Sequence, residues 1–264
     1  MKEILKNVQV NMPFGQLVEQ YLPFVLKERI NPEIGLDCFV LDRYSNEEFR
    51  KVARALCDAG LSITFHAPFY DLRPGALDHR IREVTIERLE RVFELVPWFK
   101  PKSVVCHAAF DERYYISHEM EWVENSKETW NRFVGLAEEM DTIVSLENVY
   151  EYTPEYLGLL LDAFSDNPHL ALCFDTGHCN AFSGTSMEAW MGSVGHHIGQ
   201  IHLHDNNGST DSHLPVGSGT FPFYDFFDLL RDRDRNPIIT LEPHSEGDLW
   251  RSLRNIVSMK LLCD

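Results

Sequence analysis

Residues 170–178, LALCFDTGH, carry the pattern that decides the fold of this chain. An unbroken apolar run, 170–174, is followed at once by Asp175 and then by Thr176-Gly177-His178. A continuous apolar run of this length is typical of a parallel strand that helices cover on both faces. The stretch therefore predicts a buried strand at Leu170–Asp175 whose carboxyl end carries chemically active side chains.

The same pattern recurs along the whole chain, and segments of helical periodicity separate its copies. The eight predicted strands are Val8–Met12, Glu33–Phe39, Leu61–His66, Ser103–His107, Thr142–Glu147, Leu170–Asp175, Ile198–His204 and Ile238–Glu242. Strict alternation over 264 residues predicts an α/β chain with a single domain, 1–264, folded as a (β/α)8 barrel. An open doubly wound sheet is the alternative, although no G-x-G-x-x-G motif follows the first strand.

Several predicted helices have recognisable start signals. Residues 45–48, SNEE, form a capping box, and the helix that follows is expected to stop at Gly60. Thr153-Pro154 predicts an N-cap followed by proline at the first helical position. Two helices show one apolar face, with Ile81, Val84, Leu89, Val92, Phe93 and Val96 expected to be buried in the first and Leu249, Leu253, Ile256 and Val257 in the last.

The charge balance restricts the classes of partner. Forty-one acidic residues face 24 basic ones, which gives a formal net charge of −17 without any basic tract. Binding to long nucleic acid is disfavoured, because it needs clustered Lys and Arg to replace the counterions of the phosphates.

The distribution of apolar residues and cysteines points to a cytoplasmic protein. No apolar run approaches the ~20 residues of a membrane-spanning helix, and no signal peptide is expected at the start. The cysteines are scattered, without a CxxC pair, and are expected to be reduced and mostly buried. They are Cys38, Cys57, Cys106, Cys173, Cys179 and Cys263.

Residues that can bind metal stand at the ends of six predicted strands: His66, His107, Glu147, Asp175, His202 and Glu242. Three more follow strand ends closely: His178, Asp211 and His213. A lone histidine at a strand end is more often an ordinary core or loop residue. In a parallel barrel, however, all these ends meet at one face, where active sites of this architecture are built. The joint placement therefore predicts a metal site.

The donor types favour Zn²⁺, Mn²⁺ or Fe²⁺ over Mg²⁺ and Ca²⁺, which prefer oxygen ligands. Because no cysteine stands in register, we expect a catalytic site with open positions for water or substrate. His204 shares the strand face of His202, so one of the two is expected to be a ligand and the other to support it. The role of His244 is left open.

Other catalytic schemes find no support. The chain contains neither a G-x-S-x-G elbow nor a phosphate-binding P-loop. Cys106 and His107 are neighbours on a predicted strand and point to opposite faces, so they form no nucleophile–base pair. The remaining histidines are expected to be ordinary helix or loop residues, namely His79, His118, His169, His196 and His197.

From about Leu61 to Glu242, the sequence resembles the endonuclease IV/xylose isomerase-like superfamily of TIM barrels. The pieces that carry the resemblance are His66-Ala67-Pro68, His107, Leu146-Glu147-Asn148, Asp175-Thr176-Gly177-His178, His202-Leu203-His204-Asp205, Asp211-Ser212-His213 through Gly217, and Leu241-Glu242-Pro243. Their order and their positions at strand ends make the match specific.

The resemblance implies two alternative sets of roles. Endonuclease IV-like members hydrolyse a phosphodiester with three metals held by nine ligands. Those ligands would be His66, His107, Glu147, Asp175, His178, His202, Asp211, His213 and Glu242, with Glu147 bridging and serving as the base for a metal-bound water. Sugar isomerases and epimerases of the superfamily hold one metal among Glu147, Asp175, His202 and Glu242. The two glutamates then move a proton on a bound ketose, and His178 orients its hydroxyls.

The sequence departs from both patterns. Ketose epimerases of this group carry an arginine a few residues after the position of His202, where this chain has Asp205-Asn206-Asn207-Gly208. Endonuclease IV has a polar DNA-contacting loop where this chain has Asn11-Met12.

Two hypotheses of function follow. The leading one is hydrolysis of a phosphodiester or phosphate ester in a small molecule by one to three Zn²⁺ or Mn²⁺ ions, with Glu147, Glu242 and His178 as catalytic residues. The nine-ligand count favours it, because a one-metal isomerase has no need for the outer donors. The alternative is a sugar or sugar phosphate isomerase or epimerase, and a non-catalytic binding barrel is a third class. Neither the substrate nor the oligomeric state follows from the sequence.

Overall fold

The computed structural model describes residues 1–231 and 236–262. Within those residues, eight parallel strands pair in chain order and close into a barrel through β1 and β8. The strands are β1 (Gln9–Pro13), β2 (Asn31–Gly35), β3 (Thr64–His66), β4 (Val104–His107), β5 (Val144–Glu147), β6 (Leu170–Asp175), β7 (Ile198–Leu203) and β8 (Ile238–Leu241). The predicted (β/α)8 TIM barrel is confirmed, and the open doubly wound sheet is excluded.

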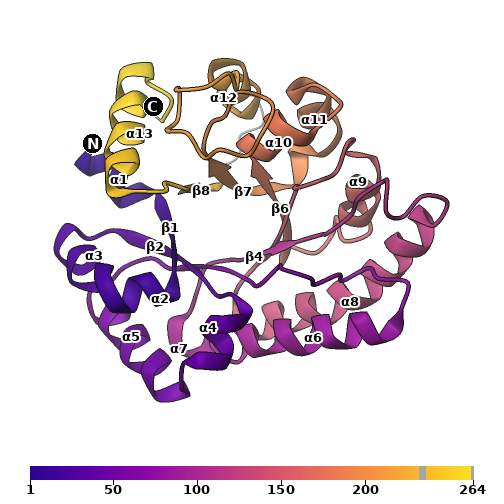
Figure 1. Cartoon of the computed structure of the whole chain (residues 1–264), viewed down its shortest axis with the longest axis horizontal. Helices are drawn as coiled ribbons and strands as arrows, with labels where there is room; N and C mark the ends of the chain where they lie inside the picture. The colour runs from indigo at the N-terminus through magenta and orange to yellow at the C-terminus, as the bar shows by residue number, and fades with distance from the viewer. Residues whose placement is uncertain (232–235, 263–264) are drawn as a thin grey trace.

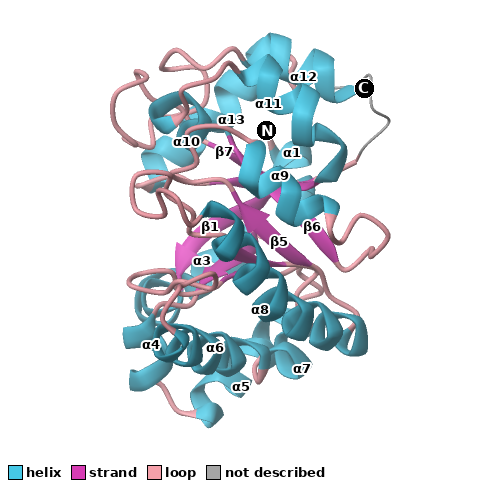
Figure 2. Cartoon of the chain, turned by 90° about the vertical axis from the view of Figure 1, so that its right-hand side faces the viewer, coloured by secondary structure: helices cyan, strands magenta, loops and turns pink. Residues whose placement is uncertain are grey.

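Helices surround the barrel, with α4–α8 on one side and α9–α13 on the other (Figure 1). Figure 2 shows the same arrangement from the side, with the strands between the two groups. The helices are α1 (Lys2–Asn7), α2 (Phe14–Gln16), the π-helical η1 (Leu17–Tyr21), α3 (Leu22–Glu28), α4 (Cys38–Arg43), α5 (Asn46–Asp58), α6 (His79–Phe93), α7 (Val96–Phe99), α8 (Glu119–Met140), α9 (Glu155–Asp162), α10 (Thr176–Phe182), α11 (Met187–Val194), the 3₁₀ turn η2 (Gly195–His197), α12 (Phe223–Arg231) and α13 (Glu246–Met259).

The predicted strand Glu33–Phe39 is wrong in its second half. β2 ends at Gly35, and Phe39 lies on α4 with 79% of its surface exposed. The side chain of Asp37 accepts a hydrogen bond of 2.7 Å from the backbone N–H of Val40, which is the N-cap contact that starts a helix. This local cap outweighs the β propensity of the residues after it.

Other predicted strands are right in place but too long. Leu61 and Thr142 donate backbone hydrogen bonds to Leu56 and Ala137, so they close the preceding helices instead of opening strands. At the carboxyl ends, β7 stops before His204 and β8 stops before Glu242. Only Leu170–Asp175 matches at both ends.

The helix predictions hold with three corrections, one at an N-cap and two in the extent of burial. The capping box at Ser45 and Glu48 is present, and Gly60 takes a positive φ of 65° directly after α5. The predicted N-cap Thr153 is wrong, because Pro154 occupies that position and the Thr153 hydroxyl donates to Glu112.

Burial on two amphipathic helices is also narrower than expected. On α6 burial begins only at Thr85, and the preceding Ile81 and Val84 are 44% and 51% exposed. On α13, Val257 is 42% exposed while its neighbour Ile256 is fully buried. Periodicity finds the apolar side of a helix, but it does not show where the partner surface ends.

A polar layer fills the barrel below the mouth. Gln200 on β7 donates to Glu33 Oε2 at 2.6 Å, and Thr64 and Thr240 donate to the same oxygen at 2.9 and 3.0 Å. Ser103 donates to Gln200 Oε1 at 2.6 Å. Side chains alternate along a strand with a period of two, so the next inward positions of β3, β7 and β8 after this layer belong to His66, His202 and Glu242.

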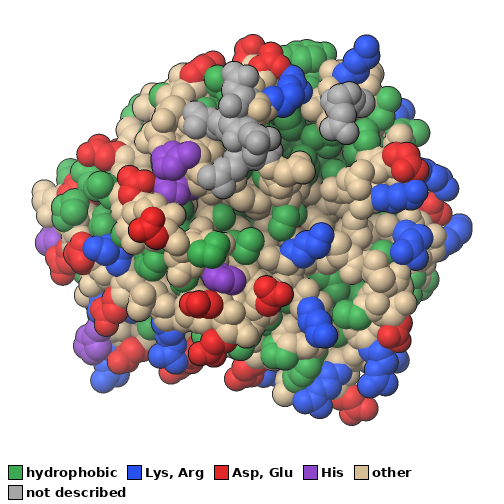
Figure 3. Space-filling view, turned by 180° about the vertical axis from the view of Figure 1, so that it is seen from behind, with side chains coloured by type: hydrophobic (Ala, Val, Ile, Leu, Met, Phe, Trp, Pro, Cys, Tyr) green, Lys and Arg blue, Asp and Glu red, His purple; other side chains and the backbone are tan. Residues whose placement is uncertain are grey.

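The surface and the cysteines agree with the sequence in part. Lys and Arg side chains are interspersed with Asp and Glu on the face seen in Figure 3. All cysteines in the described residues are free, but Cys57 is exposed and Cys38 is half-buried, so burial is less general than expected. Cys263 lies outside the described residues. Across the described residues, helices long and apolar enough to cross a membrane are absent.

Candidate metal centre

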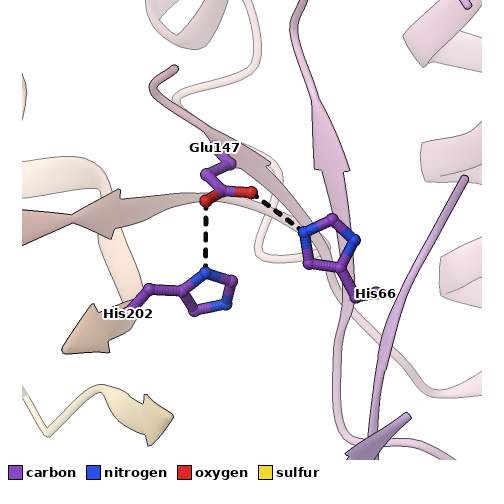
Figure 4. Close-up of side chains that lie close together, drawn as sticks. All are labelled: His66, Glu147 and His202. Carbon is purple, nitrogen blue, oxygen red and sulfur yellow. Dashed lines mark hydrogen bonds and ion pairs between the residues drawn. The ribbon is translucent and has the colours of Figure 1, made fainter. Parts of the chain in front are cut away.

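Glu147, buried at the end of β5, lies at the centre of a cluster of imidazoles. Its Oε2 is 3.2 Å from Nε2 of both His66 and His107, which end β3 and β4. Its Oε1 is 3.2 Å from Nδ1 of His202 and 3.3 Å from Nδ1 of His178. Figure 4 shows His66 and His202 pointing toward the two oxygens of the carboxylate. One carboxylate thus contacts side chains from three strands, β3, β4 and β7, and from α10.

A second arrangement surrounds Nδ1 of His202. This atom lies 3.2 Å from Glu147 Oε1, 3.2 Å from Glu242 Oε1 and 3.7 Å from Asp175 Oδ2. Two atoms that bind one Zn²⁺ or Mn²⁺ at about 2.1 Å lie about 3.0–3.4 Å apart. The distances from His202 Nδ1 to Glu147 and Glu242 are therefore those of ligands that share one ion, and Asp175 lies slightly further away.

The remaining predicted ligands lie beside this group. Asp211 Oδ2 is 3.0 Å from Nε2 of His213 and 3.3 Å from Nε2 of His178. His213 Nδ1 lies 3.6 Å from Glu242 Oε2. His213 has a positive φ of 46°, a left-handed conformation that is costly for a residue with a side chain and concentrates at functional sites. All nine sequence-predicted residues are thus brought to one end of the barrel.

His204 is a tenth donor within the same cluster. Its Nε2 lies 3.0 Å from Asp175 Oδ2, and its ring stacks on that of His213 with centroids 3.9 Å apart. A Cβ on Gly177 would lie 1.9 Å from the His204 ring, so only glycine leaves room for it there. His244 is exposed and stacks on His213 with centroids 4.6 Å apart. His204 is therefore placed to bind, whereas His244 is a ring contact at the rim.

Several buried polar atoms of the cluster lack a hydrogen bond among the described residues. They are His202 Nε2, which faces Glu33 Oε1 at 3.1 Å, and His204 Nδ1 and Asp211 Oδ1, which lie 3.5 Å from one another. Each atom therefore has an oppositely charged neighbour in the cluster without a well-formed hydrogen bond to it. Close-packed imidazoles and carboxylates of this kind form a donor set that fits a transition metal ion.

Glu33 is a buried carboxylate beside the cluster that the sequence pattern did not single out as a site residue. It is fully buried on β2, and its Oε1 lies 3.1 Å from His202 Nε2, on the opposite side of the ring from Glu147. A carboxylate behind a ligating imidazole fixes the ring orientation and its tautomer. An acidic residue inside a predicted buried strand is the signal that could have identified it, since such a residue is rarely buried without a partner.

Replacing Glu33 by Gln is expected to weaken metal binding about 10–100-fold, because the amide no longer supports the imidazole of His202 with a negative charge. Titration with Zn²⁺ against a competing chelator measures this affinity. Thr64→Val is the matched control, since it removes one donor to Glu33 and leaves the charge. Equal affinities of the wild type and Glu33→Gln would show that Glu33 has no role in the site.

A model of the family described as xylose isomerase-like TIM barrel matches residues 32–258. The chain belongs to this family. Among curated proteins, the uncharacterized protein MJ1311 from Methanocaldococcus jannaschii is 29% identical over 199 residues, which are 73% of this chain and 68% of that protein.

Solved structures share the fold of this family member over nearly its full length. A D-tagatose 3-epimerase-like protein has a TM-score of 0.78 and 24% identity, covering 97% of both chains. The TTHB071 protein from Thermus thermophilus, in crystals soaked with ZnCl₂, has a TM-score of 0.77 and 22% identity, covering 96% of this chain and 97% of that one. Further structures of this fold are titled as sugar epimerases.

In this xylose isomerase-like barrel, Asp205 and Asn206 stand where the resemblance to ketose epimerases implies an arginine. They hold the loop after β7 in place. Asp205 is fully buried and accepts hydrogen bonds from the backbone N–H groups of Asn206, Gly219 and Phe221. Asn206, also buried, donates to the carbonyl of Gly177. These bonds fix both ends of the loop that carries Asp211 and His213.

A cavity of about 450 Å³ opens above the cluster. Glu147, His178, Asp211, His213 and Glu242 form part of its lining. Its apolar walls are aromatic and come from the loops after β3 and β5 and from α10, namely Phe69, Tyr70, Tyr150 and Phe182. Among the described residues that line it, none is Lys or Arg. The volume suits one small molecule.

The carboxylates of the metal-free cluster hold several of its imidazoles in the charged form, although burial lowers the pKa of one of them, His107. Burial alone would lower the pKa of the His213 imidazole, but Asp211 and Glu242 outweigh it and raise that pKa to about 9. The pKa values of His178 and His202 are also raised, against the effect of burial, by the carboxylates beside them. Protonated imidazoles therefore substitute for the charge of an ion.

From these shifts, the metal-free protein is expected to lose stability as the pH rises. Its raised histidine pKa values contribute stability that is fully present below the unfolded value near 6.5 and is lost as the pH passes through the folded values. We therefore expect the free energy of unfolding of the metal-free protein to fall between pH 6.5 and about 9. Urea denaturation at several pH values measures it. The Zn²⁺-loaded protein should lose less, because metal binding needs deprotonated ligands. A constant stability across this range would contradict the prediction.

Proposed function

We propose that this chain is a metal-dependent isomerase or epimerase that acts on a small, sugar-like carbonyl substrate. The observation that carries the proposal is the grouping of Glu147, Asp175 and Glu242 around Nδ1 of His202, next to a cavity sized for one small molecule. From the sequence, phosphodiester hydrolysis ranks first. Solved structures that share the fold include a D-tagatose 3-epimerase-like protein and D-psicose 3-epimerase, and this likeness supports the reverse order.

The four donors would hold one Zn²⁺ or Mn²⁺, which would polarise the carbonyl and hydroxyl oxygens of a bound substrate. Glu147 is the last residue of β5, Glu242 directly follows β8, and both line the cavity. Each carboxylate can accept or return a proton at a carbon next to the carbonyl. His178, whose Nδ1 lies 3.0 Å from the carbonyl oxygen of Asn148, is fixed in a position to orient a substrate hydroxyl.

The walls of the cavity favour an uncharged polyol over a phosphate. Aromatic rings such as Tyr70, Tyr150 and Phe182 offer flat apolar faces to the C–H groups of a sugar. A phosphate group would need positive charge, and among the described lining residues only imidazoles can supply it. A neutral sugar needs no such partner.

Proton exchange in D₂O tests the proposal. The Mn²⁺- or Zn²⁺-loaded protein is incubated with a panel of ketoses and aldoses, and the loss of one C–H signal and the appearance of an isomer are followed by NMR. We expect exchange at a carbon next to the carbonyl for at least one sugar. Absence of both exchange and product with every sugar, in protein that holds metal, would overturn the proposal.

Hydrolysis of a small phosphodiester is the second candidate, because one specific observation favours it. His66, His107, His178, Asp211 and His213 all lie within the same cluster, although a one-metal site does not need them. A second or third ion bound there would supply the positive charge that the cavity lacks, and would activate a water molecule as nucleophile.

His107→Ala and His213→Ala separate the two candidates. In a multinuclear hydrolase, either change should lower the metal content by about one ion and reduce cleavage of an aryl phosphodiester. In a one-metal isomerase, the metal content should stay constant and substrate affinity should fall. Elemental analysis and both assays measure these outcomes. His118→Ala is the control, because His118 lies at the start of α8 and contacts Glu121 instead of the cluster.

A further inference from the structure

A second cavity, of about 300 Å³, adjoins the metal centre on the outer side of β1. Its walls belong to β1, to the helical segment from Gln16 to Val25, and to the loop after β8 with the start of α13. Four residues line both this cavity and the one above the cluster: Asn11, Pro13, His213 and Glu242. The two cavities therefore meet at Glu242, one of the two proposed proton-transfer residues.

The lining of this second cavity is apolar in its depth. Val10, Val25, Ile30 and Leu249 are buried side chains, and Met12 joins them from the outer face of β1. Tyr21 and Phe24 add two partly exposed aromatic rings. Sites for small molecules are concave and lined mainly by apolar and aromatic side chains, so a pocket with this lining is suited to a ligand.

The charged groups at the cavity exclude an anion. Glu242 and Glu246 line it, together with His213 and His244, whereas the described lining residues include neither Lys nor Arg. A phosphate or carboxylate group placed here would face two carboxylates without a permanent positive charge beside it. The occupant is therefore not an anion, and the apolar depth of the cavity favours an uncharged group over a cation.

The backbone next to this cavity is irregular. Between α2 and α3 the chain forms the π-helical turn η1, and the residues at its borders, Gln16 and Tyr21, both line the cavity. Widened helical turns of this kind occur mostly at functional sites, because they cost stability and redirect side chains. Here the turn directs an aromatic ring to the wall of the cavity.

We propose that this cavity is a subsite for an uncharged aryl group carried by the substrate, and that the enzyme acts on carbonyl-bearing sugars with an aryl substituent in preference to unsubstituted ones. This assignment rests on the proposed function, because it places the hydroxylated part of the same molecule at the metal centre. The shared border at Glu242 and His213 lets one molecule occupy both cavities. The apolar depth then binds the ring, and the metal centre binds the polyol.

Matched pairs of phenyl and methyl glycosides of glucose, galactose and xylose test the subsite. Glycosides have no free carbonyl, so they report on binding and not on turnover. With the Zn²⁺-loaded protein in a calorimeter, we expect at least one phenyl glycoside to bind about tenfold or more tightly than its methyl partner. Phe24→Ser should reduce this ratio to near one. Phe39→Ser is the control, because it makes the same change on exposed α4, outside the cavity.

Phenol alone, as a competitor of the phenyl glycoside, keeps the test decisive if Phe24→Ser does not fold. The subsite is overturned if the phenyl and methyl glycosides of every pair bind equally tightly, or if no phenyl glycoside binds. It is also overturned if phenol does not weaken the binding of the preferred phenyl glycoside to the wild type. The D₂O exchange assay reports separately on the chemistry. If a ketose proton exchanges but phenyl glycosides bind no more tightly than methyl glycosides, only the subsite proposal is contradicted. If phenyl glycosides bind more tightly but no proton exchanges, only the proposed reaction is contradicted.

Discussion

Glu147→Gln is expected to lower turnover at least about a thousandfold and to release bound metal. The carboxylate of Glu147 contacts four imidazoles at 3.2–3.3 Å and is also a proposed proton-transfer group. Burial would raise its pKa, but the charges of His202 and His107 outweigh burial and hold the pKa well below its ordinary value. An amide keeps the shape but provides neither the charge nor the base, and loss of a general base alone costs about 10²–10⁴ in rate.

Turnover of the sugar found by proton exchange and elemental analysis of the purified variant measure the two effects. Glu151→Gln is a matched control, because Glu151 is a buried glutamate four residues after Glu147 in the chain. Its carboxylate accepts hydrogen bonds from the backbone N–H groups of Val149 and Phe110. Burial raises the pKa of Glu151 to about 7, so its neutral form already resembles an amide. Wild-type turnover in Glu147→Gln would remove Glu147 from both proposed mechanisms.

Removal of the metal is expected to abolish turnover completely, and Zn²⁺ or Mn²⁺ should restore it where Mg²⁺ and Ca²⁺ do not. The donor set contains imidazole nitrogens as well as carboxylate oxygens. The imidazoles favour transition metal ions over Mg²⁺ and Ca²⁺, which prefer oxygen ligands. Without an ion, Asp175, Glu147 and Glu242 have no centre that polarises a substrate carbonyl.

Turnover is measured on the purified protein, on the same protein after dialysis against a chelator, and again after the dialysed protein has been reloaded with each ion. Circular dichroism of the stripped protein at pH 6.5 separates loss of metal from loss of fold, since protonated imidazoles stabilise the metal-free cluster at this pH. Full turnover in protein with no detectable metal would contradict the metal-dependent mechanism.

The barrel could be predicted from the sequence because it depends on a repeated local pattern. Buried parallel strands read as apolar runs, and their alternation with amphipathic helices leaves few topologies. The boundaries were less predictable. Phe39 and Val40 have the propensity of a strand, yet the Asp37 cap places them in α4.

The sequence by itself determined which end of the barrel carries the candidate site and which donor types meet there. His66, Glu147 and Asp175 end their strands, and parallel strands of one barrel end at one face, so their convergence needs no knowledge of packing.

Only the tertiary structure decided which donors lie close enough to bind one ion, that Glu33 stands behind His202, and that a second cavity opens beside β1. Glu33 and His202 are neighbours across the barrel interior, 169 positions apart in the chain, and Phe24 and Glu242 line one cavity only through the packing of α3 beside β1 and α13. Donor distances and cavities depend on side-chain packing between such distant segments, and a local sequence pattern holds no record of that packing.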